Sequence, residues 1–335
     1  MTLTQPLFTG FALLTRYRMA ATGIQLRAVE RQQAAQDIVK KVKLAYLNIL
    51  LAQKILEVSD DTVKSLEAHV ADALKLYDQG MIPYNDLLQA KVGLANVVQK
   101  RAEAAGRLDV AVSMLNVLMA VDLNRDTRVT DIPHDMPPLL DLEPLLAEAR
   151  KQRPEIEAMS LALRQAEHGV TMAQSQYYPQ IALVGRYEQN GENLEATKNR
   201  FSNDHNQLVM VTAEWKFFEW GKTRSDVSRV HHERLALKEK FQAVVESIQL
   251  EVKDAYVKVQ VARENVRTAE HALDQARENL RITNVQYRQQ MATTTDVLDA
   301  TAFLSQGQTN YYSALYGYQM AMAELERAIG KSVNR

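Results

Sequence analysis

Two aspartates placed three residues apart are the first feature of this sequence that could do chemistry. Asp296 and Asp299 stand in the segment DVLD, directly after a break in a long helical pattern, and Asp86 follows an earlier break. Residues three apart lie on neighbouring turns of a helix, so Asp296 and Asp299 could share one face of it. The alternative is that these aspartates begin helices, where a solvated carboxylate favours the helix dipole.

Other sets of reactive residues are incomplete. Gly221–Thr223 and Gly330–Ser332 resemble the end of a phosphate-binding loop, but the glycine required five residues upstream is Lys216 in one case and Leu325 in the other. The seven histidines are dispersed without metal-ligand spacing. The chain has no cysteine, and no serine or carboxylate arrangement suggests a hydrolase. We therefore expect no enzyme active site, no cofactor and no metal site.

The segments that hold the aspartates belong to an internal repeat with an offset of 210 residues. The offset relates Tyr46 to Tyr256 and needs no gap over more than a hundred residues, a register that two unrelated helices would not share. Other identical pairs are Val42/Val252, Tyr77/Tyr287, Met81/Met291, Asp86/Asp296 and Leu88/Leu298.

Each copy carries an apolar seam whose spacing alternates between four and three residues. The seam runs from Ile38 to Tyr77 in the first copy and from Ile248 to Tyr287 in the second. A repeat of about 3.5 residues predicts a left-handed coiled coil. Tyr77 and Tyr287 end the two seams, so they either pack there or form hydrogen bonds between neighbouring helices.

The seams and their breaks predict a mainly α chain of two tandem antiparallel helical hairpins with short strands. We expect helices at about 10–79, 84–120, 145–176, 221–289 and 296–330, and strands at 180–187 and 207–218 on either side of a polar loop at 188–206.

Three segments follow from this division. The first repeat covers 1–120, an irregular proline-bearing linker covers 121–144, and the second repeat covers 145–335. Thr2–Phe8 corresponds to 212–218, so the first repeat starts inside a strand and lacks its leading helix and strand, about 65 residues. We therefore expect an N-terminally truncated form, whose truncation would also have removed a signal peptide.

Charge and hydropathy exclude further classes of protein. The net charge is −1 and no basic stretch is studded with aromatic residues, which argues against a nucleic-acid partner. No apolar run reaches the roughly 18 residues of a transmembrane helix, and the first ten residues do not read as a signal peptide. The lack of cysteine fits an exported protein that avoids thiols.

Four aromatic residues lie near the ends of the expected strands: Tyr177, Tyr178, Trp215 and Trp220. Apolar and polar residues alternate along 207–218, as in a barrel strand with a wet interior. Aromatic side chains at such ends can anchor a barrel at a membrane interface. A soluble hairpin with ordinary alternation would look the same.

Over essentially its whole length the chain resembles the TolC-like outer-membrane efflux family. The segments that carry the resemblance are LTQPLFTG, KLYDQGMIPYNDLLQAK, RPEIEAMSLALRQAEHGVTMAQSQYYPQIALVGRYE and VQYRQQMATTTDVLDATAFL. The resemblance implies a homotrimer in the outer membrane of a Gram-negative bacterium, with a 12-stranded β-barrel to which these strands contribute and a helical tunnel across the periplasm. It also implies an equatorial collar at 121–144 and the final few residues.

The resemblance further implies partners and a passive function. A periplasmic adaptor and an inner-membrane pump would join the duct, and outer-membrane lipid would surround its barrel. Multidrug efflux, metal efflux and type I secretion all stay open as the subclass.

Site residues also follow from the resemblance. In that family the hairpin turns form the periplasmic tip, where the tunnel narrows and the adaptor docks. The resemblance places Asp296 and Asp299 at the pore entrance and makes Asp86, Tyr77 and Tyr287 candidates for the contacts that close it. Residues expected at the adaptor-docking tip are Gly80, Met81, Ile82, Pro83, Gln290, Met291 and Ala292.

Two departures from the family and three competing classes remain. Gln290 stands where the family often has glycine, and Ala292 where some members carry a basic residue. A periplasmic adaptor would need a lipoyl-like β domain with one hairpin, whereas this chain has two hairpins. A cytosolic or periplasmic coiled-coil scaffold explains the heptads but neither the strands nor the two breaks, and an enzyme has the least support.

Overall fold

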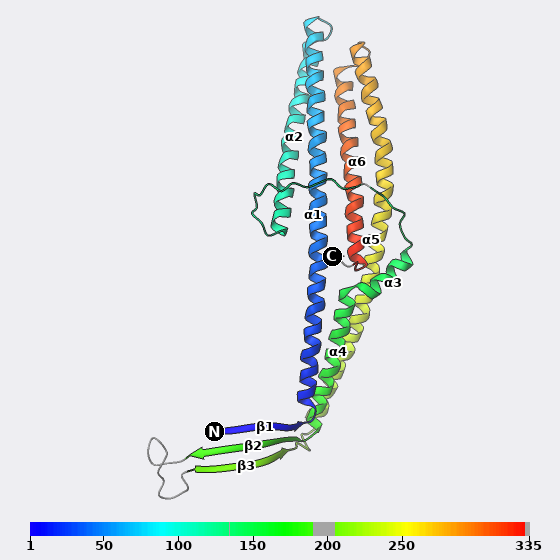
Figure 1. The fold of residues 1–335 in the computed structure, drawn as a ribbon. Coiled ribbons are helices and arrows are strands. Elements are labelled where there is room, and N and C mark those ends of the chain that lie inside the picture. The colour runs from blue at the N-terminus through cyan, green and yellow to red at the C-terminus, as the bar shows by residue number, and fades with distance from the viewer. Residues whose placement is uncertain (134, 190–204, 332–335) are drawn as a thin grey trace. The chain divides into compact units, whose positions relative to one another are not determined.

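A computed structural model describes residues 1–133, 135–189 and 205–331 (Figure 1). The order of elements confirms a mainly helical chain with two long hairpins and short strands. The elements are β1 (Thr2–Thr9), α1 (Ala12–Asp78), α2 (Tyr84–Leu118), α3 (Leu142–Gln152), α4 (Pro154–Gln174), a short 3-10 turn (Ser175–Tyr177), β2 (Gln180–Gln189), β3 (His205–Glu214), α5 (Lys222–Arg288) and α6 (Thr294–Ala328).

The two hairpins have matching lengths. Helices α1 and α5 each have 67 residues, and α2 and α6 each have 35. Lys222 and Thr294 begin α5 and α6, 210 positions after Ala12 and Tyr84 begin α1 and α2. The duplication in the sequence is therefore also a duplication of the helices.

The prediction of a single helix at 145–176 is wrong. Helix α3 already begins at Leu142 and ends at Gln152, and α4 starts at Pro154. Between them Arg153 is extended, with φ −71° and ψ 118°. A proline excludes the helical conformation from the residue before it and is favoured at the first position of a new helix, so Pro154 divides this stretch in two.

The strand bounds also differ from expectation. Strand β3 ends at Glu214, so 215–218 lies outside the strand that was expected to reach 218. Strands β2 and β3 extend into both ends of the loop expected at 188–206, and the remainder of that loop, 190–204, lies outside the described residues.

Contacts divide the chain into two compact units that cut across the two repeats. One unit contains Met1–Gln33 and Pro154–Ser247, and the other contains Ala34–Arg153 and Ile248–Arg335. Helices α1 and α5 each begin in the first unit and end in the second. The division into repeats at 1–120, 121–144 and 145–335 stays a prediction about ancestry and segment roles.

The first unit contains an antiparallel sheet in the order β1-β2-β3. Leu183 in the middle strand pairs with Gln5 on one side and Val211 on the other. The register shifts between Pro6 and Phe8, because a bulge inserts an extra residue into β1. In the same unit the Gln165 side chain of α4 donates to the Met19 carbonyl of α1 at 3.2 Å.

The second unit is held together by small apolar clusters between its helices. Near the first turn Ala73 of α1 packs with Leu87 and Ala90 of α2. Farther from the turn Leu47 and Leu50 of α1 pack with the fully buried Tyr316 of α6. Figure 1 shows α2 beside α1 and α6 beside α5 within this unit.

Between α2 and α3 the described residues, 119–133 and 135–141, form no helix or strand. This segment crosses α1 and α6 in Figure 1. The Tyr46 hydroxyl of α1 donates to the Thr130 carbonyl and accepts from the Thr130 amide, at 2.5 and 2.9 Å. At the end of α2 the Asn116 side-chain Nδ2 donates to the carbonyls of Leu123 and Arg125. These bonds fix the linker to the helices beneath it.

None of the helices in the described part of the chain is apolar over a length that would cross a membrane. The same residues hold no group of three or more histidine, aspartate or glutamate side chains arranged for a metal ion.

Candidate functional site

The first hairpin turn is a glycine-terminated helix end. The Gly80 amide donates to the Tyr77 carbonyl at 2.8 Å, and the Met81 amide donates to the Leu76 carbonyl at 2.8 Å. This pair of bonds is the Schellman motif, which requires a left-handed residue at the end of the helix. Gly80 supplies it with φ +69°, and Pro83 then precedes α2.

The second turn repeats this geometry without glycine. The Gln290 amide donates to the Tyr287 carbonyl at 2.9 Å, and the Met291 amide donates to the Gln286 carbonyl at 2.8 Å. Gln290 has φ +63°, a conformation that costs a residue with a Cβ roughly 1–2 kcal/mol. The chain therefore keeps the shape of the turn at the expense of local strain.

Asp296 forms a capping box with Thr293 at the start of α6. Its Oδ2 accepts from the Thr293 amide and from the Thr293 hydroxyl, both at 2.7 Å, and its own amide donates to the Thr293 Oγ1 at 3.2 Å. The bonds from the Thr293 amide and hydroxyl hold the pKa of Asp296 below its ordinary value. The exposed carboxylate therefore stays charged, and the capping position agrees with the alternative considered from the sequence; its role at a pore stays a prediction.

The two other predicted acids are placed differently from Asp296. Asp299 lies one turn farther along α6 and is exposed. Asp86 lies in the first turn of α2, where Pro83 offers no side-chain cap, and it is half-buried. The structure thus presents Asp296 and Asp299 to solvent, on neighbouring turns of one helix.

The two predicted tyrosines occupy unlike surroundings despite their equivalent positions. Tyr77 is partly exposed, and its ring lies 5.4 Å from that of Tyr84 across its own turn. Tyr287 is buried, its hydroxyl lies 3.3 Å from the Thr294 Oγ1, and its ring centroid lies 4.8 Å from that of His69. Tyr287 of the second hairpin therefore contacts α1 of the first.

His69 was not identified from the sequence as a site residue. The equivalent residue in the second repeat is Asn279. This difference between the two copies could have indicated that the histidine has a role in the first hairpin only.

Further contacts join the hairpins near their turns. The Thr295 hydroxyl of α6 donates to the Gln89 side-chain oxygen of α2 at 3.3 Å. The Arg288 guanidinium of α5 lies 3.7 Å from the Asp72 carboxylate of α1. At Gly93 an added Cβ would lie 2.6 Å from the Leu298 side chain, so the absent side chain allows α2 and α6 to approach closely.

The tip itself presents two exposed methionines, Met81 and Met291, one on each turn. Ile82 instead packs against the cluster of Ala73, Leu87 and Ala90. The other residues predicted for adaptor docking lie in the same two turns: Gly80, Pro83, Gln290 and Ala292.

The four predicted interface aromatics lie within the first unit, where strands join helices. Trp220 is 90% exposed. The Trp215 indole N–H donates to the Tyr177 carbonyl at 3.1 Å. Tyr178 forms edge-to-face contacts with Phe8 and Phe11. These junctions carry exposed aromatic rings next to backbone that leaves the sheet.

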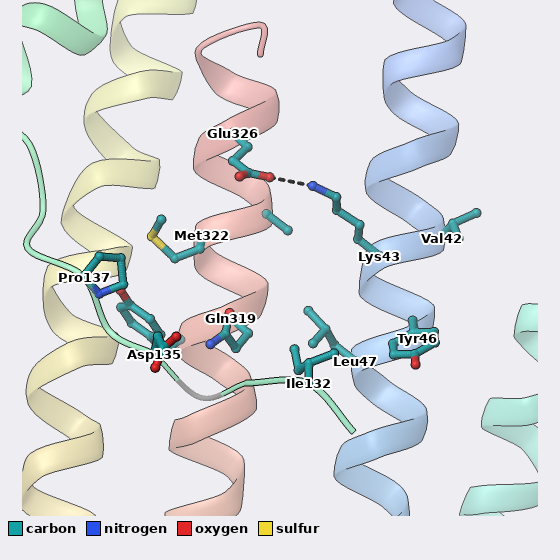
Figure 2. Close-up of a pocket in the computed structure, with 12 residues that line it drawn as sticks. Val42, Lys43, Tyr46, Leu47, Ile132, Asp135, Pro137, Gln319, Met322 and Glu326 are labelled. Atoms are coloured by element: carbon teal, nitrogen blue, oxygen red, sulfur yellow. Dashed lines mark hydrogen bonds and ion pairs between the residues drawn. The ribbon is translucent and has the colours of Figure 1, made fainter. Parts of the chain in front are cut away.

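A cavity of about 520 Å³ lies in the second unit between α1, the linker and α6. Figure 2 shows Leu47 and Ile132 on one side of it and Met322 and Pro137 on the other. At one end the Lys43 ammonium lies 2.6 Å from the Glu326 carboxylate (Figure 2). The sequence did not indicate this cavity, because its walls come from three separate segments.

Comparisons with known proteins agree on one family. The sequence pattern of the family described as outer membrane efflux protein matches residues 1–121 and 145–331. The outer membrane protein TolC of Escherichia coli strain K12 is 22% identical over 344 residues, which cover 98% of this chain and 68% of that protein. TolC of Vibrio cholerae is 22% identical over 311 residues, which cover 91% of this chain and 70% of that protein.

Solved structures show the same fold. A membrane protein from Pseudomonas aeruginosa superposes with a TM-score of 0.85 at 17% identity and covers 98% of this chain and 76% of its own. The outer membrane protein VceC from Vibrio cholerae superposes with a TM-score of 0.84 at 18% identity and covers 99% of this chain and 79% of its own.

Proposed function

Since the chain belongs to the outer membrane efflux protein family, we propose that it is one subunit of a passive duct whose periplasmic entrance lies at the two hairpin turns. The family places the protein in the outer membrane of a Gram-negative bacterium, and related channels work in tripartite efflux systems. The observation that carries the proposal is the pair of equal hairpins that meet at their turns through α2 and α6. The coiled-coil scaffold finds no support in the family assignment.

The entrance of this duct is formed by three copies of the chain around one axis. Each exposed carboxylate then appears three times, so Asp296 and Asp299 supply six negative charges close together. Such rings focus negative potential, attract cations and are blocked by multivalent ones. The exposure of both carboxylates on α6 supports this role.

A periplasmic adaptor binds the tip, and an inner-membrane pump supplies the cargo. Met81 and Met291 support this interaction, because exposed methionines form adaptable apolar contacts. The neighbouring residues Gly80, Ile82, Pro83, Gln290 and Ala292 complete the docking surface, and Asp86, Tyr77 and Tyr287 contribute to the closed entrance. The duct serves either efflux of small molecules or type I secretion and catalyses no reaction of its own.

The first unit, which contains the strands, contacts outer-membrane lipid. Tyr177, Tyr178, Trp215 and Trp220 are exposed at the junctions between strands and helices. Their amphipathic rings suit the boundary between lipid headgroups and the membrane interior.

The test is reconstitution of the protein into planar bilayers and measurement of block by a trivalent cation. We expect discrete channels, and we expect Asp296→Asn with Asp299→Asn to weaken the block at least about tenfold, because the carboxylate rings lose their charge. Asparagine at position 296 keeps a side-chain oxygen that can accept from the Thr293 amide. Asp274→Asn, a change on the surface of α5, is the matched control. Unchanged block in the double variant would refute the entrance role, and a soluble dimeric rod would refute the duct.

A further inference from the structure

One histidine is buried at the contact between the two hairpins. His69 of α1 is 6% exposed, and its Nε2 has no hydrogen-bond partner among the described residues. The imidazole ring lies at 58° to the Tyr287 ring of α5, with 4.8 Å between the centroids. Tyr287 in turn contacts Thr294, the first residue of α6. A single imidazole thus connects the first hairpin to the start of the second turn.

The groups around His69 do not offer a strong partner for a positive charge. On its own helix Asp72 lies one turn away, but this carboxylate also lies 3.2 Å from the Lys75 ammonium and 3.7 Å from the Arg288 guanidinium. From α5 the Tyr287 phenol packs against the ring, and Thr294 of α6 contacts that phenol, while the Arg288 cation lies against Asp72. Asp72 is therefore already shared between two cations.

Burial of a neutral imidazole costs less free energy than burial of an imidazolium that lacks a full set of hydrogen-bond partners. Desolvation lowers the pKa of His69 below its ordinary 6.5, and the charge of Asp72 opposes this only in part. The packed arrangement is fully favoured above about pH 6.5 and loses stability as the pH falls from there towards the lowered pKa of His69.

The contact occurs in one copy of the repeat only. Asn279 replaces His69 in the second copy, and Tyr77, the equivalent of Tyr287, contacts Tyr84 within its own hairpin. A coiled coil of this design therefore does not need a histidine at this position for its packing.

We propose that His69 is a positioning residue that holds Tyr287 and the second turn against the first hairpin while neutral, and that its protonation releases them, so that mild acid opens the entrance. The opening of an entrance rests on the proposed function, whereas the release of one hairpin from the other does not depend on it.

The first experiment measures the separation of the turns. The chain has no cysteine, so Gln79→Cys and Gln289→Cys provide two unique sites for spin labels, one beside each turn. Pulsed electron spin resonance on labelled protein diluted with unlabelled protein is recorded at about pH 7.5 and about pH 5.5. We expect a shift to longer distances, or a several-fold broader distribution, at the lower pH.

Two variants test whether His69 is responsible. His69→Phe keeps a ring against Tyr287 but cannot be protonated, and His69→Gln is a neutral polar replacement for use if phenylalanine disturbs folding. Both are expected to give the same distances at the two pH values. The matched control His271→Gln, on the exposed surface of α5, is expected to keep the acid response. Equal distances at both pH values in the parent protein, or an acid response that survives in His69→Phe and His69→Gln, would overturn the proposal.

The second experiment separates this proposal from the channel function. In planar bilayers the parent channel should spend more time open at the lower pH, and the His69 variants should not. Channels that conduct equally at both pH values overturn the proposal on His69 and leave the duct intact. Acid-dependent distances that the His69 variants lose, in a protein that forms no channel, support the role of His69 and refute the duct.

Discussion

Arg153 holds Glu251 with two parallel hydrogen bonds, from Nη1 to Oε1 at 3.2 Å and from Nη2 to Oε2 at 2.7 Å. The same Nη1 donates to the carbonyls of Arg327 and Ala328 at the end of α6, each at 3.2 Å. Arg153 is 5% exposed. One guanidinium at the end of α3 therefore joins α5 to the terminal carbonyls of α6, where a positive charge also favours the helix dipole.

Replacement of this guanidinium should destabilise the second unit. Arg153→Ala leaves the buried end of α6 without its donors, although Glu251 is about half exposed and regains water. We expect a loss of about 2–3 kcal/mol in the free energy of unfolding, below the range for a fully buried pair. Denaturant unfolding followed by circular dichroism measures it. Arg153→Lys should recover only part of the loss, since an ammonium cannot make the two-point contact.

The exposed pair of Lys258 and Asp254 is the control for this experiment. Lys258→Ala should leave the unfolding midpoint unchanged within error, because surface ion pairs contribute little. Equal losses in Arg153→Ala and Lys258→Ala would contradict the role given to burial.

Substitutions at the two left-handed turn positions, Gln290 and Gly80, should change stability in opposite directions. Gln290→Gly removes the strain at φ +63° and should stabilise the protein by about 0.5–1 kcal/mol, since the gain exceeds the larger chain entropy of glycine in the unfolded state. Gly80→Ala places a Cβ at φ +69° and should destabilise by about 1 kcal/mol. Unfolding midpoints of the two variants, measured side by side, decide the matter. Changes of the same sign would contradict the inference that the left-handed backbone of both turns favours glycine.

Asp296 should make the stability of the start of α6 depend on pH in the acid range. Its pKa lies below the ordinary 3.8 because the Thr293 amide and hydroxyl donate to the ionised form. The stabilisation is therefore present above about pH 3.8 and disappears as the pH falls through the lowered pKa. In Thr293→Val the hydroxyl is lost and the pKa of Asp296 should rise. Carbon NMR of the carboxyl group measures it, with Thr295→Val as the neighbouring control that should leave the titration unchanged.

Tyr316 should make the protein sensitive to alkali. Its hydroxyl donates to the Asp131 carboxylate at 3.1 Å, and burial together with that carboxylate raises its pKa well above the ordinary 10. The stabilisation is present below about pH 10 and is lost at higher pH, where the unfolded tyrosine ionises and the folded one resists. Stability measured between pH 9 and 11 should fall less steeply in Tyr316→Phe than in the parent protein. At neutral pH the same variant should lose about 1–2 kcal/mol, because Asp131 loses a hydrogen bond made with its charge.

The capping of Asp296 could have been predicted more fully from the sequence. Thr293 precedes it by three residues, and a threonine followed by an acceptor at this spacing resembles a capping box. The break before Pro154 could also have been predicted from the sequence, because a proline restricts the backbone of the preceding residue in any tertiary context.

By itself the sequence determined the duplication, the lengths of the hairpins and the places where they turn. These features depend on local causes: the spacing of the seam from Ile38 to Tyr77, the proline at 83 and the 210-residue register. Only the tertiary structure decided that Tyr77 and Tyr287 differ, because the identity of their neighbours comes from chain segments far away. Tyr287 meets His69, more than two hundred residues distant, and Tyr77 meets Tyr84 in its own turn. The burial and the electrostatic environment of such a contact depend on residues from several helices, so the sequence of one helix does not determine them.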